Sequence, residues 1–217
     1  MTRRLIDLAV ASGALLAASP LLLAIALAIR IKEGAPVFFQ QWRAGRNGVP
    51  FRMIKFRTMI VNAEKVGGSL TYQADRRITP LGRFLRRSKL DELPQLINIL
   101  RGEMTIIGPR PEVLDWVERY TAEQREVLRA KPGLSDPVQL LFRHEQDFLS
   151  DTAEYHLLMP IKVARQIEYL RSRTALSDLR TAFLTLRAIF PSKPAEEELA
   201  VYAAIRERKQ IGLVTDS

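Results

Sequence analysis

Two adjacent acids, Asp91 and Glu92, follow a strongly basic segment of the chain: residues 76–89 contain six arginines and lysines. Acids in the first turn of a helix most often cap it or offset its dipole. However, the N–H groups of a helix start, set among cations, also favour phosphate. An aspartate there can attack phosphorus and form a covalent intermediate. The residues alone leave both roles open.

Attack by an anion on an anionic diphosphate requires that negative charge be cancelled, by arginines and by a divalent metal. Carboxylate ligands and the absence of cysteine favour Mg²⁺ as that metal. Lys55 and Arg57 follow one another closely in a predicted strand. They either reach a substrate phosphate or remain solvated.

The N-terminal residues 5–29 are apolar except for one charge, Asp7. The run is long enough to cross a bilayer, yet basic residues flank both ends and favour the cytoplasmic side for each. Pro20 lacks an N–H, and Ser19 can hydrogen-bond to the carbonyl that this frees. We therefore predict a re-entrant membrane anchor over residues 1–32, broken at Ser19-Pro20. The alternative is a straight, kinked helix that spans the membrane. A cleaved signal peptide is not favoured, because the run greatly exceeds the apolar region of a signal peptide.

The composition indicates an anionic partner. The chain has 33 Lys+Arg against 24 Asp+Glu, a net charge of +9. Because the chain also has an apolar anchor, this excess of positive charge favours membrane phospholipid as the anionic partner. Nucleic acid is not expected, because there is no recognisable binding motif and only 7% of residues are aromatic. Cys is absent, which excludes disulfides and thiolate chemistry.

The predicted fold class is α+β: mostly helical, with a small antiparallel sheet. Strands are expected over residues 37–42 and 51–58, joined by a turn at Gly45 and Asn47-Gly48. Helices are expected over residues 81–90, 93–100, 113–129, 160–172, 178–190 and 195–209. The basic helix 81–90 fits either a membrane surface or an ordinary solvated face. Because Pro94 is tolerated only in a first turn, we place Asp91 at or next to the next N-cap.

We expect three parts: the anchor over residues 1–32, a catalytic domain over residues 33–190, and a C-terminal helix and tail over residues 191–217.

Four motifs occur in order along the chain. They are Lys55-Phe56-Arg57-Thr58-Met59, Leu90-Asp91-Glu92-Leu93-Pro94-Gln95-Leu96, Gly108-Pro109-Arg110-Pro111-Glu112 and Lys131-Pro132-Gly133-Leu134-Ser135. Behind a Ser-Pro-broken anchor, this order resembles the bacterial sugar transferases that act on polyprenyl phosphate, the monotopic phosphoglycosyl transferases. The resemblance covers roughly residues 1–190. Larger relatives carry extra N-terminal membrane spans, and this chain is similar to the minimal catalytic form.

The resemblance implies transfer of sugar 1-phosphate from a UDP-sugar to polyprenyl (undecaprenyl) phosphate, releasing UMP, as the first membrane step of glycan or glycoconjugate assembly. It implies a location at the bacterial inner membrane, with the catalytic domain on the cytoplasmic face. Asp91 would be the nucleophile and a Mg²⁺ ligand, and Glu92 would complete an acidic dyad. The resemblance further assigns phosphate binding to Arg86, a nucleotide-binding loop to Pro109, Arg110 and Pro111, and the break in the membrane helix to Ser19 and Pro20.

One departure concerns residues 135–137. Many relatives continue from Lys-Pro-Gly into a Thr-Gly turn, whereas Ser135-Asp136-Pro137 follows here. The sugar therefore stays open, as does whether the chain forms a homodimer. The competing class of function is a non-catalytic basic protein that docks on anionic lipid or scaffolds membrane enzymes.

Overall fold

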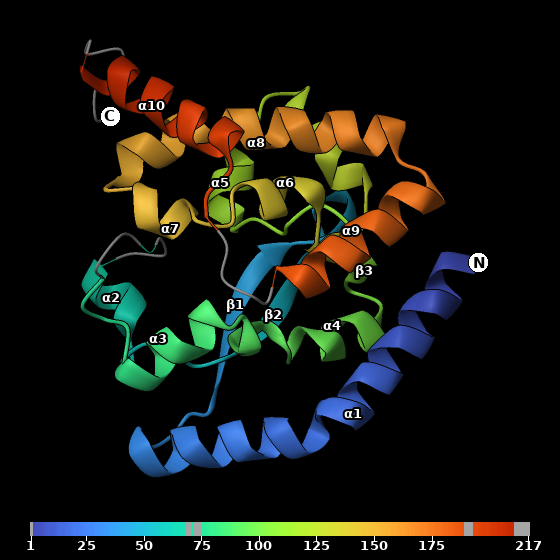
Figure 1. Ribbon diagram of the computed structural model, residues 1–217, viewed down its shortest axis with the longest axis vertical. Coiled ribbons are helices and arrows are strands. Elements are labelled where there is room, and N and C mark those ends of the chain that lie inside the picture. Colours follow the sequence, from blue (N-terminus) through green and yellow to red (C-terminus); the bar gives the residue numbers. More distant parts are fainter. Residues whose placement is uncertain (1, 68–70, 72–74, 189–192, 211–217) are drawn as a thin grey trace.

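The computed structural model describes residues 2–67, 71, 75–188 and 193–210. Its first element is the long helix α1 (Thr2–Lys32), which lies along one side of the body and changes direction midway (Figure 1). Pro20 lies inside α1 and cannot donate to the carbonyl of Leu16, four residues earlier. The Ser19 hydroxyl donates to that carbonyl at 2.8 Å, so the helix continues through the proline without an unpaired carbonyl there.

Both ends of α1 are fixed to the rest of the protein. Near its start, Arg4 donates to the carbonyl of Ile99 at 2.5 Å, and the buried Asp7 accepts from the hydroxyl of Thr105 at 2.8 Å. Near its end, Ile29 is fully buried in an apolar cluster that includes residues 56 and 85. The middle of the helix leaves most of its apolar side chains exposed.

The predicted hairpin is confirmed. Strand β1 (Phe38–Ala44) pairs antiparallel with β2 (Pro50–Phe56), and Asn47 and Gly48 adopt left-handed φ angles of 57° and 76° in the turn. The helix α4 (Gln95–Arg101) packs against β2 and α1.

A second sheet was not foreseen. Strand β3 (Thr105–Ile107) pairs in parallel with β4 (Gly133–Ser135), so the expectation of antiparallel pairing holds only for the hairpin. The two backbone segments meet at glycines: a Cβ on Gly133 would lie 2.1 Å from the nitrogen of Gly108. Only glycine permits so close an approach of backbones, and this contact joins two of the sequence motifs.

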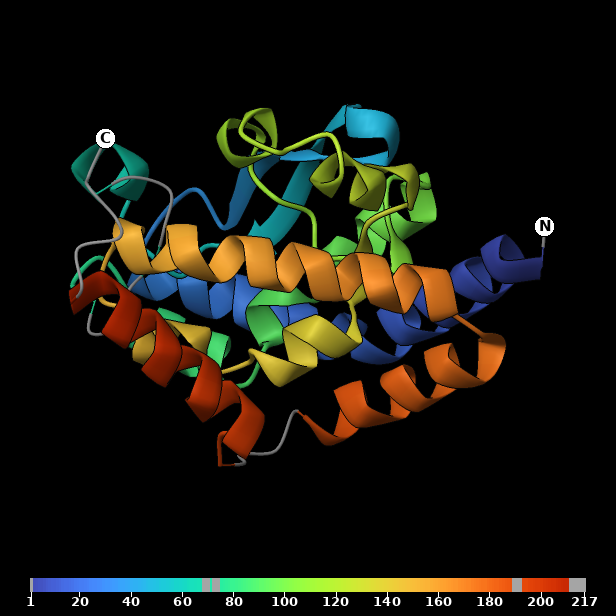
Figure 2. The ribbon, with the colours of Figure 1, turned by 90° about the horizontal axis from the view of Figure 1, so that it is seen from above.

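Most of the remaining chain is helical, which confirms the mostly helical α+β class. The other α-helices are α2 (Ala63–Gly67), α3 (Pro80–Arg87), α5 (Leu114–Glu118), α6 (Pro137–Leu141), α7 (Glu145–Phe148), α8 (Thr152–Ser172), α9 (Ala175–Arg187) and α10 (Glu196–Gln210). Short 3₁₀ segments occupy Arg46–Gly48, Leu90–Glu92 and Gln124–Arg129. Helix α8 crosses the whole body, and α10 packs against it (Figure 2). Tyr202 and Ile205 of α10 belong to a buried apolar cluster that also includes side chains of α8.

The largest differences between the predicted and the observed helices concern two segments. The helix expected over residues 113–129 divides into α5 and a separate 3₁₀ segment. Helix α8 begins well before residue 160, because Asp151 caps it by accepting from the N–H of Glu154 at 3.0 Å. Pro160 therefore lies inside α8 rather than at its start.

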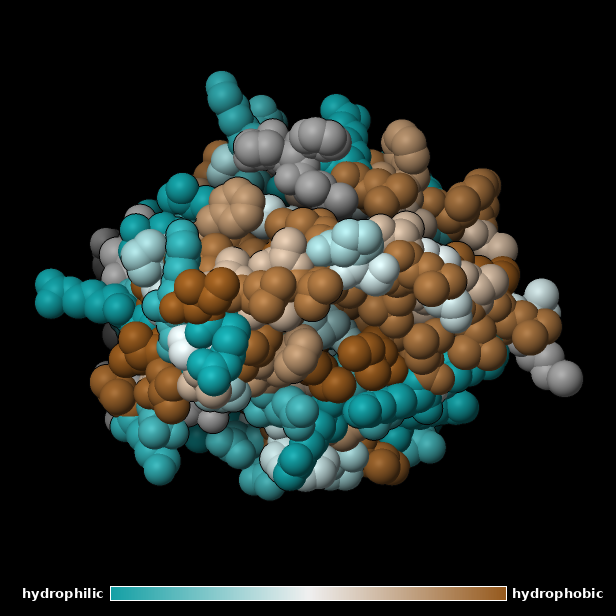
Figure 3. Space-filling model, turned by 90° about the horizontal axis from the view of Figure 1, so that it is seen from below, coloured by the Kyte–Doolittle hydropathy of each residue, from teal (hydrophilic) through white to brown (hydrophobic). Residues whose placement is uncertain are grey.

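Exposed apolar side chains gather on one face. In the most apolar 18-residue window of α1, only 11% of residues are buried inside the protein. Helix α9 presents an outward stripe of large apolar side chains, each more than 60% exposed: Leu176, Leu179, Phe183 and Leu186. Figure 3 shows a broad apolar area on the α1 side of the molecule, bordered by hydrophilic side chains. Arg3 of α1 forms an ion pair of 3.5 Å with Asp178 of α9, which holds the two helices near each other.

Candidate active site

The two acids lie in the 3₁₀ turn Leu90–Glu92, between α3 and α4. Lys89, with a left-handed φ of 57°, turns the chain sharply at the end of α3. The N-cap of α4 is Pro94, so the expectation that Asp91 would stand at or next to that N-cap is wrong. The chain closes a separate turn first, and this turn places Asp91 in the interior rather than on the helix dipole.

Glu92 is held by two cations from distant parts of the chain. Its Oε1 lies 2.8 Å from Nζ of Lys55 on β2 and 3.2 Å from Nη2 of Arg110. Burial alone would raise the pKa of Glu92, but the charges of Lys55 and Arg110 outweigh it and hold that pKa well below its usual range. Glu92 is therefore a fixed anion that holds Lys55 and Arg110 in place.

Asp91 is placed very differently. Its side chain is buried, and Oδ1 has no hydrogen-bond partner among the residues that the structure describes. Burial, together with repulsion from Glu92, raises the pKa of Asp91 against the attraction of Lys55, Lys89 and Arg86. A desolvated carboxylate oxygen with no donor is a strong nucleophile and a ready ligand for a cation.

Two of the predicted phosphate-binding arginines have different surroundings. Arg86, on α3, donates from Nε to the hydroxyl of Thr58 at 2.8 Å, and its charge acts on Asp91. Arg57 instead donates from Nη2 to the carbonyls of Glu33 and Gly34 at the end of α1, at 2.8 and 3.1 Å. The structure thus brings Lys55, Arg86 and Arg110 around the acids, while Arg57 bonds to the chain at the end of α1.

The predicted nucleotide loop is fixed through its backbone at each residue. The carbonyl of Pro109 accepts from the N–H of Gly133 at 2.9 Å, and that of Pro111 accepts from Arg43 at 3.2 Å. Between them, the N–H of Arg110 donates to Oδ2 of Asp136 at 3.0 Å. This loop is therefore rigid, and it delivers the guanidinium of Arg110 to Glu92.

Asp136 belongs to the segment that departs from the family pattern, and its role was missed. It is fully buried and caps α6 by accepting from the N–H groups of Val138 and Gln139 at 2.7 and 2.9 Å, besides that of Arg110. Burial raises the pKa of Asp136, although these hydrogen bonds oppose the shift. An Asp-Pro pair is a common helix start, because aspartate caps and proline fits the first turn. That signal could have identified Asp136.

Glu112, at the end of the nucleotide loop, is a second buried acid. Glu112 accepts from the hydroxyl of Tyr155 on α8 at 3.1 Å and lies 3.8 Å from Nη1 of Arg43. Its carbonyl accepts from the N–H of Ala44 at 2.9 Å. Glu112 thus has a structural role: it attaches the end of the nucleotide loop to β1 and α8.

The acids offer few protein ligands to a metal. Within the described ranges, no group of three or more His, Cys, Asp or Glu side chains could hold an ion. Oε1 of Glu92 is already shared by two cations, whereas Oδ1 of Asp91 has no hydrogen-bond partner among the described residues. Mg²⁺ commonly binds through one or two carboxylates, waters and substrate phosphates. The residues fit such a shared site and do not form a closed protein cage.

Asp136 provides a test of how the loop is held. Asp136→Ala should lower the free energy of unfolding by about 2 kcal/mol or more, because it removes a helix cap and leaves the N–H of Arg110 unpaired. Asp151→Ala is the matched control, which removes the cap of α8 and should cost only about 1 kcal/mol. Chemical unfolding in detergent measures both. Equal losses would show that the buried bonds of Asp136 to Arg110 and Gln166 add nothing beyond the helix cap.

Comparison with known proteins identifies the family. The family model described as "Bacterial sugar transferase" matches residues 1–192. The exopolysaccharide production protein ExoY of Sinorhizobium fredii is 34% identical, over 89% of this chain and 87% of its own length. The UDP-glucose:undecaprenyl-phosphate glucose-1-phosphate transferase of Escherichia coli is 37% identical over 90% of this chain, which spans 41% of that protein. An Aeromonas hydrophila UDP-N-acetylgalactosamine-undecaprenyl-phosphate N-acetylgalactosaminephosphotransferase is 35% identical over 79% of this chain and 39% of its own length. The chain is therefore an enzyme of the bacterial sugar transferase family.

Proposed function

We propose that this enzyme transfers sugar 1-phosphate from a UDP-sugar to polyprenyl phosphate and releases UMP. The observation that carries the proposal is the unequal pair of acids: Glu92 is fixed by Lys55 and Arg110, while Asp91 keeps a buried, unpartnered oxygen. The names of the E. coli and A. hydrophila relatives specify undecaprenyl phosphate as the acceptor of such transfers. By this proposal the chain carries out the first membrane step of a glycan or glycoconjugate pathway.

In the first step, a carboxylate oxygen of Asp91 attacks the phosphorus that carries the sugar. The bond from that phosphorus to the oxygen bridging it to the UMP phosphate breaks, and UMP leaves with the bond's electron pair. In the second step, an oxygen of the ionised lipid phosphate attacks the same phosphorus and displaces Asp91. The product is polyprenyl-diphosphate-sugar. Because the lipid phosphate is already an anion, the second step needs no strong general base.

The neighbouring residues hold the charge of the reacting groups. The charges of Arg86 and Lys89 act on Asp91, so they would also attract a diphosphate that approaches this side chain. Arg110, held between its backbone bond to Asp136 and its ion pair with Glu92, would bind the nucleotide side of the donor. Their positions are set before substrate arrives, so little reorganisation is needed in the transition state.

We further propose that the carboxylate of Asp91 would hold a Mg²⁺ ion when the donor is bound. The fit rests on the unpartnered Oδ1 of Asp91 and on an oxygen-only donor set. When bound, the ion would neutralise diphosphate charge and stabilise the leaving UMP.

Replacement of the nucleophile tests the covalent step. Asp91→Asn should reduce UMP release at least about a thousandfold, because an amide cannot form the acyl-phosphate intermediate. Membrane association should not change. The matched control is Asp115→Asn on the exposed surface of α5, which should keep full activity. A phosphosugar adduct on Asp91, seen by mass spectrometry after mixing with donor alone, is the direct evidence.

The same experiment addresses the competing function. A non-catalytic scaffold would release no UMP even when unmodified and would tolerate Asp91→Asn. Full UMP release by Asp91→Asn would contradict the proposed mechanism, as would turnover without any adduct on that side chain.

Metal removal tests the second part of the proposal. EDTA should reduce UMP release to background, and added Mg²⁺ should restore it, whereas the thermal unfolding temperature should not change. The reason is that the metal would be held largely by substrate rather than by a protein cage. Full activity in EDTA would contradict the Mg²⁺ proposal but leave the covalent mechanism standing.

We also propose that α1 enters the membrane from one side and does not cross it. At about 1.5 Å per residue α1 could span a bilayer. However, Asp7 near its start and Ile29 near its end are both buried against the same body. The exposed apolar sides of α1 and α9 would then contact lipid, with the active site in the adjoining water. UDP-sugars are made in the cytoplasm, which places the protein on that face of the bacterial inner membrane.

Because the natural chain has no cysteine, single introduced cysteines can report this topology. Thr2→Cys and Ala35→Cys lie beyond the two ends of the apolar run, and Val49→Cys, in the exposed hairpin turn, reports the side of the catalytic domain. All three should react with an impermeant maleimide in inverted vesicles and none in spheroplasts. Labelling of Thr2→Cys from the opposite side would establish a straight span.

A further inference from the structure

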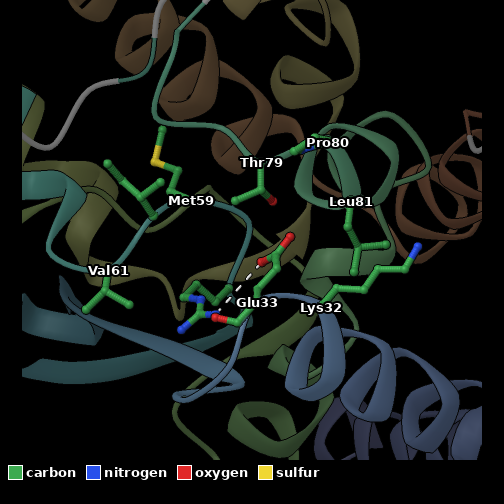
Figure 4. A pocket seen from close by; sticks show the side chains of 9 residues that line it. Lys32, Glu33, Met59, Val61, Thr79, Pro80 and Leu81 are labelled. Atoms are coloured by element: carbon green, nitrogen blue, oxygen red, sulfur yellow. Dashed lines mark hydrogen bonds and ion pairs between the residues drawn. The ribbon is translucent and has the colours of Figure 1, made fainter.

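A cavity of about 700 Å³ opens between the end of α1 and the start of α3 (Figure 4). In the close-up, Met59 and Val61 stand on one side, Leu81 and Lys32 on the other, and Glu33 between them. No role has been assigned to it so far. Its volume falls in the range of pockets that bind small molecules.

The lining of the cavity is that of a site for an amphiphile. Most of its exposed wall is apolar, and it includes Met59, Ile60, Val61 and Leu81. The charged lining residues are Lys32, Glu33 and Arg57, so the cavity carries a net positive charge of one. An apolar chain with an anionic head suits this combination better than a purely polar or a purely apolar molecule.

Arg57 supplies an independent indication of an anion. Its side chain is only 6% exposed, and its ion pair with Glu33 is loose, at 3.9 Å. Its Nε and Nη1 have no hydrogen-bond partner within the part of the chain that the structure describes. Buried guanidinium nitrogens are normally paired, and phosphate oxygens match their geometry. A bound phosphate would therefore complete the bonding of Arg57.

The cavity adjoins both the lipid face and the candidate active site. Helix α1, which ends at the cavity, carries the exposed apolar face. On the inner side, Thr58 lies in the sequence between the cavity residues Arg57 and Met59. Its hydroxyl accepts from Nε of Arg86 at 2.8 Å. A Cβ on Gly82 would lie only 2.0 Å from the carbonyl oxygen of Thr58, so α3 packs directly on this wall. The charge of Arg86 acts on Asp91, so this wall connects the cavity to the proposed nucleophile.

We propose that this cavity binds the head of the lipid acceptor, a long-chain prenyl phosphate: its first isoprene units lie along Met59, Val61 and Leu81, and its phosphate faces Arg57. This inference rests on the proposed function, because it assigns a place to the second substrate of that reaction. Donor and acceptor then approach Asp91 from different sides, the nucleotide from Arg110 and the lipid from the end of α1. The acceptor need not leave the membrane to react.

The test separates the two halves of the reaction. With donor alone, the unmodified enzyme should release one burst of UMP per active site. Val61→Trp, which fills the mouth of the cavity, should leave the amplitude of that burst unchanged and raise the KM for undecaprenyl phosphate at least tenfold. Val49→Trp is the matched control: Val49 is also an exposed valine, at 65%, but lies in the hairpin turn outside the cavity, so both quantities should be unchanged.

A second measurement does not depend on a variant. A prenyl phosphate with a photoreactive diazirine near its phosphate should label peptides 59–61 and 79–81 of the unmodified enzyme. Excess undecaprenyl phosphate should prevent the labelling, whereas phosphatidylglycerol vesicles should not. Suppression by phosphatidylglycerol alone would assign the cavity to bulk phospholipid and overturn the proposal.

The remaining outcomes are also distinct. An unchanged acceptor KM in Val61→Trp, or labelling confined to other peptides, would overturn the acceptor site while leaving the transferase intact. Absence of the UMP burst from the unmodified enzyme would instead contradict the proposed covalent function.

Discussion

The site depends on one shared carboxylate. Glu92 bridges a lysine of the hairpin and an arginine of the proline-flanked loop, and these lie far apart in the sequence. Two adjacent acids in a dry interior would normally repel each other and compete for the same cations. Here Glu92 forms the close ion pairs with both cations, so Asp91 keeps an oxygen with no partner among the described residues. The chemistry of Asp91 therefore follows from how completely its neighbour is satisfied.

The rest of the fold supplies the two cations at fixed positions. Lys55 is carried by a strand whose outer edge is covered by Asn98 of α4, which accepts from the N–H of Ile54 and donates to the carbonyl of Arg52. Arg110 is carried by a loop whose backbone is bonded to β4, to β1 and to the cap of α6. Each attachment uses buried polar groups that are costly to leave unpaired. Positioning is thus achieved through hydrogen bonds more than through apolar packing.

Sequence reasoning succeeded where a local rule applied. The hairpin was predicted from its turn residues, and the tail helix was expected over residues 195–209, both with bounds close to those observed. It failed where distant segments determine the conformation. The parallel pairing of β3 with β4 requires the contact of Gly108 with Gly133, and no local pattern encodes it.

The candidate site shows the same division. The motifs identified the acids, Lys55 and Arg110 as residues that belong together, and the structure brings them together. Sequence did not show that Glu92 is saturated and Asp91 is not, because that difference depends on which side chains reach each oxygen. Nor did it show that Arg57 bonds to the end of the anchor. Asp136 looked like a departure from a pattern, although its pairing with Pro137 is a local helix-start signal.

The hydroxyl of Ser19 affects what α1 requires from its surroundings. A proline inside a membrane helix ordinarily leaves a bare carbonyl, whose burial in hydrocarbon is unfavourable until another helix or water approaches it. In α1 that carbonyl is satisfied by the residue just before the proline. The bend of α1 therefore needs no hydrogen-bond partner from another segment at that point. This property suits the one-sided entry into the membrane proposed above, because the exposed apolar helix carries no unpaired carbonyl there.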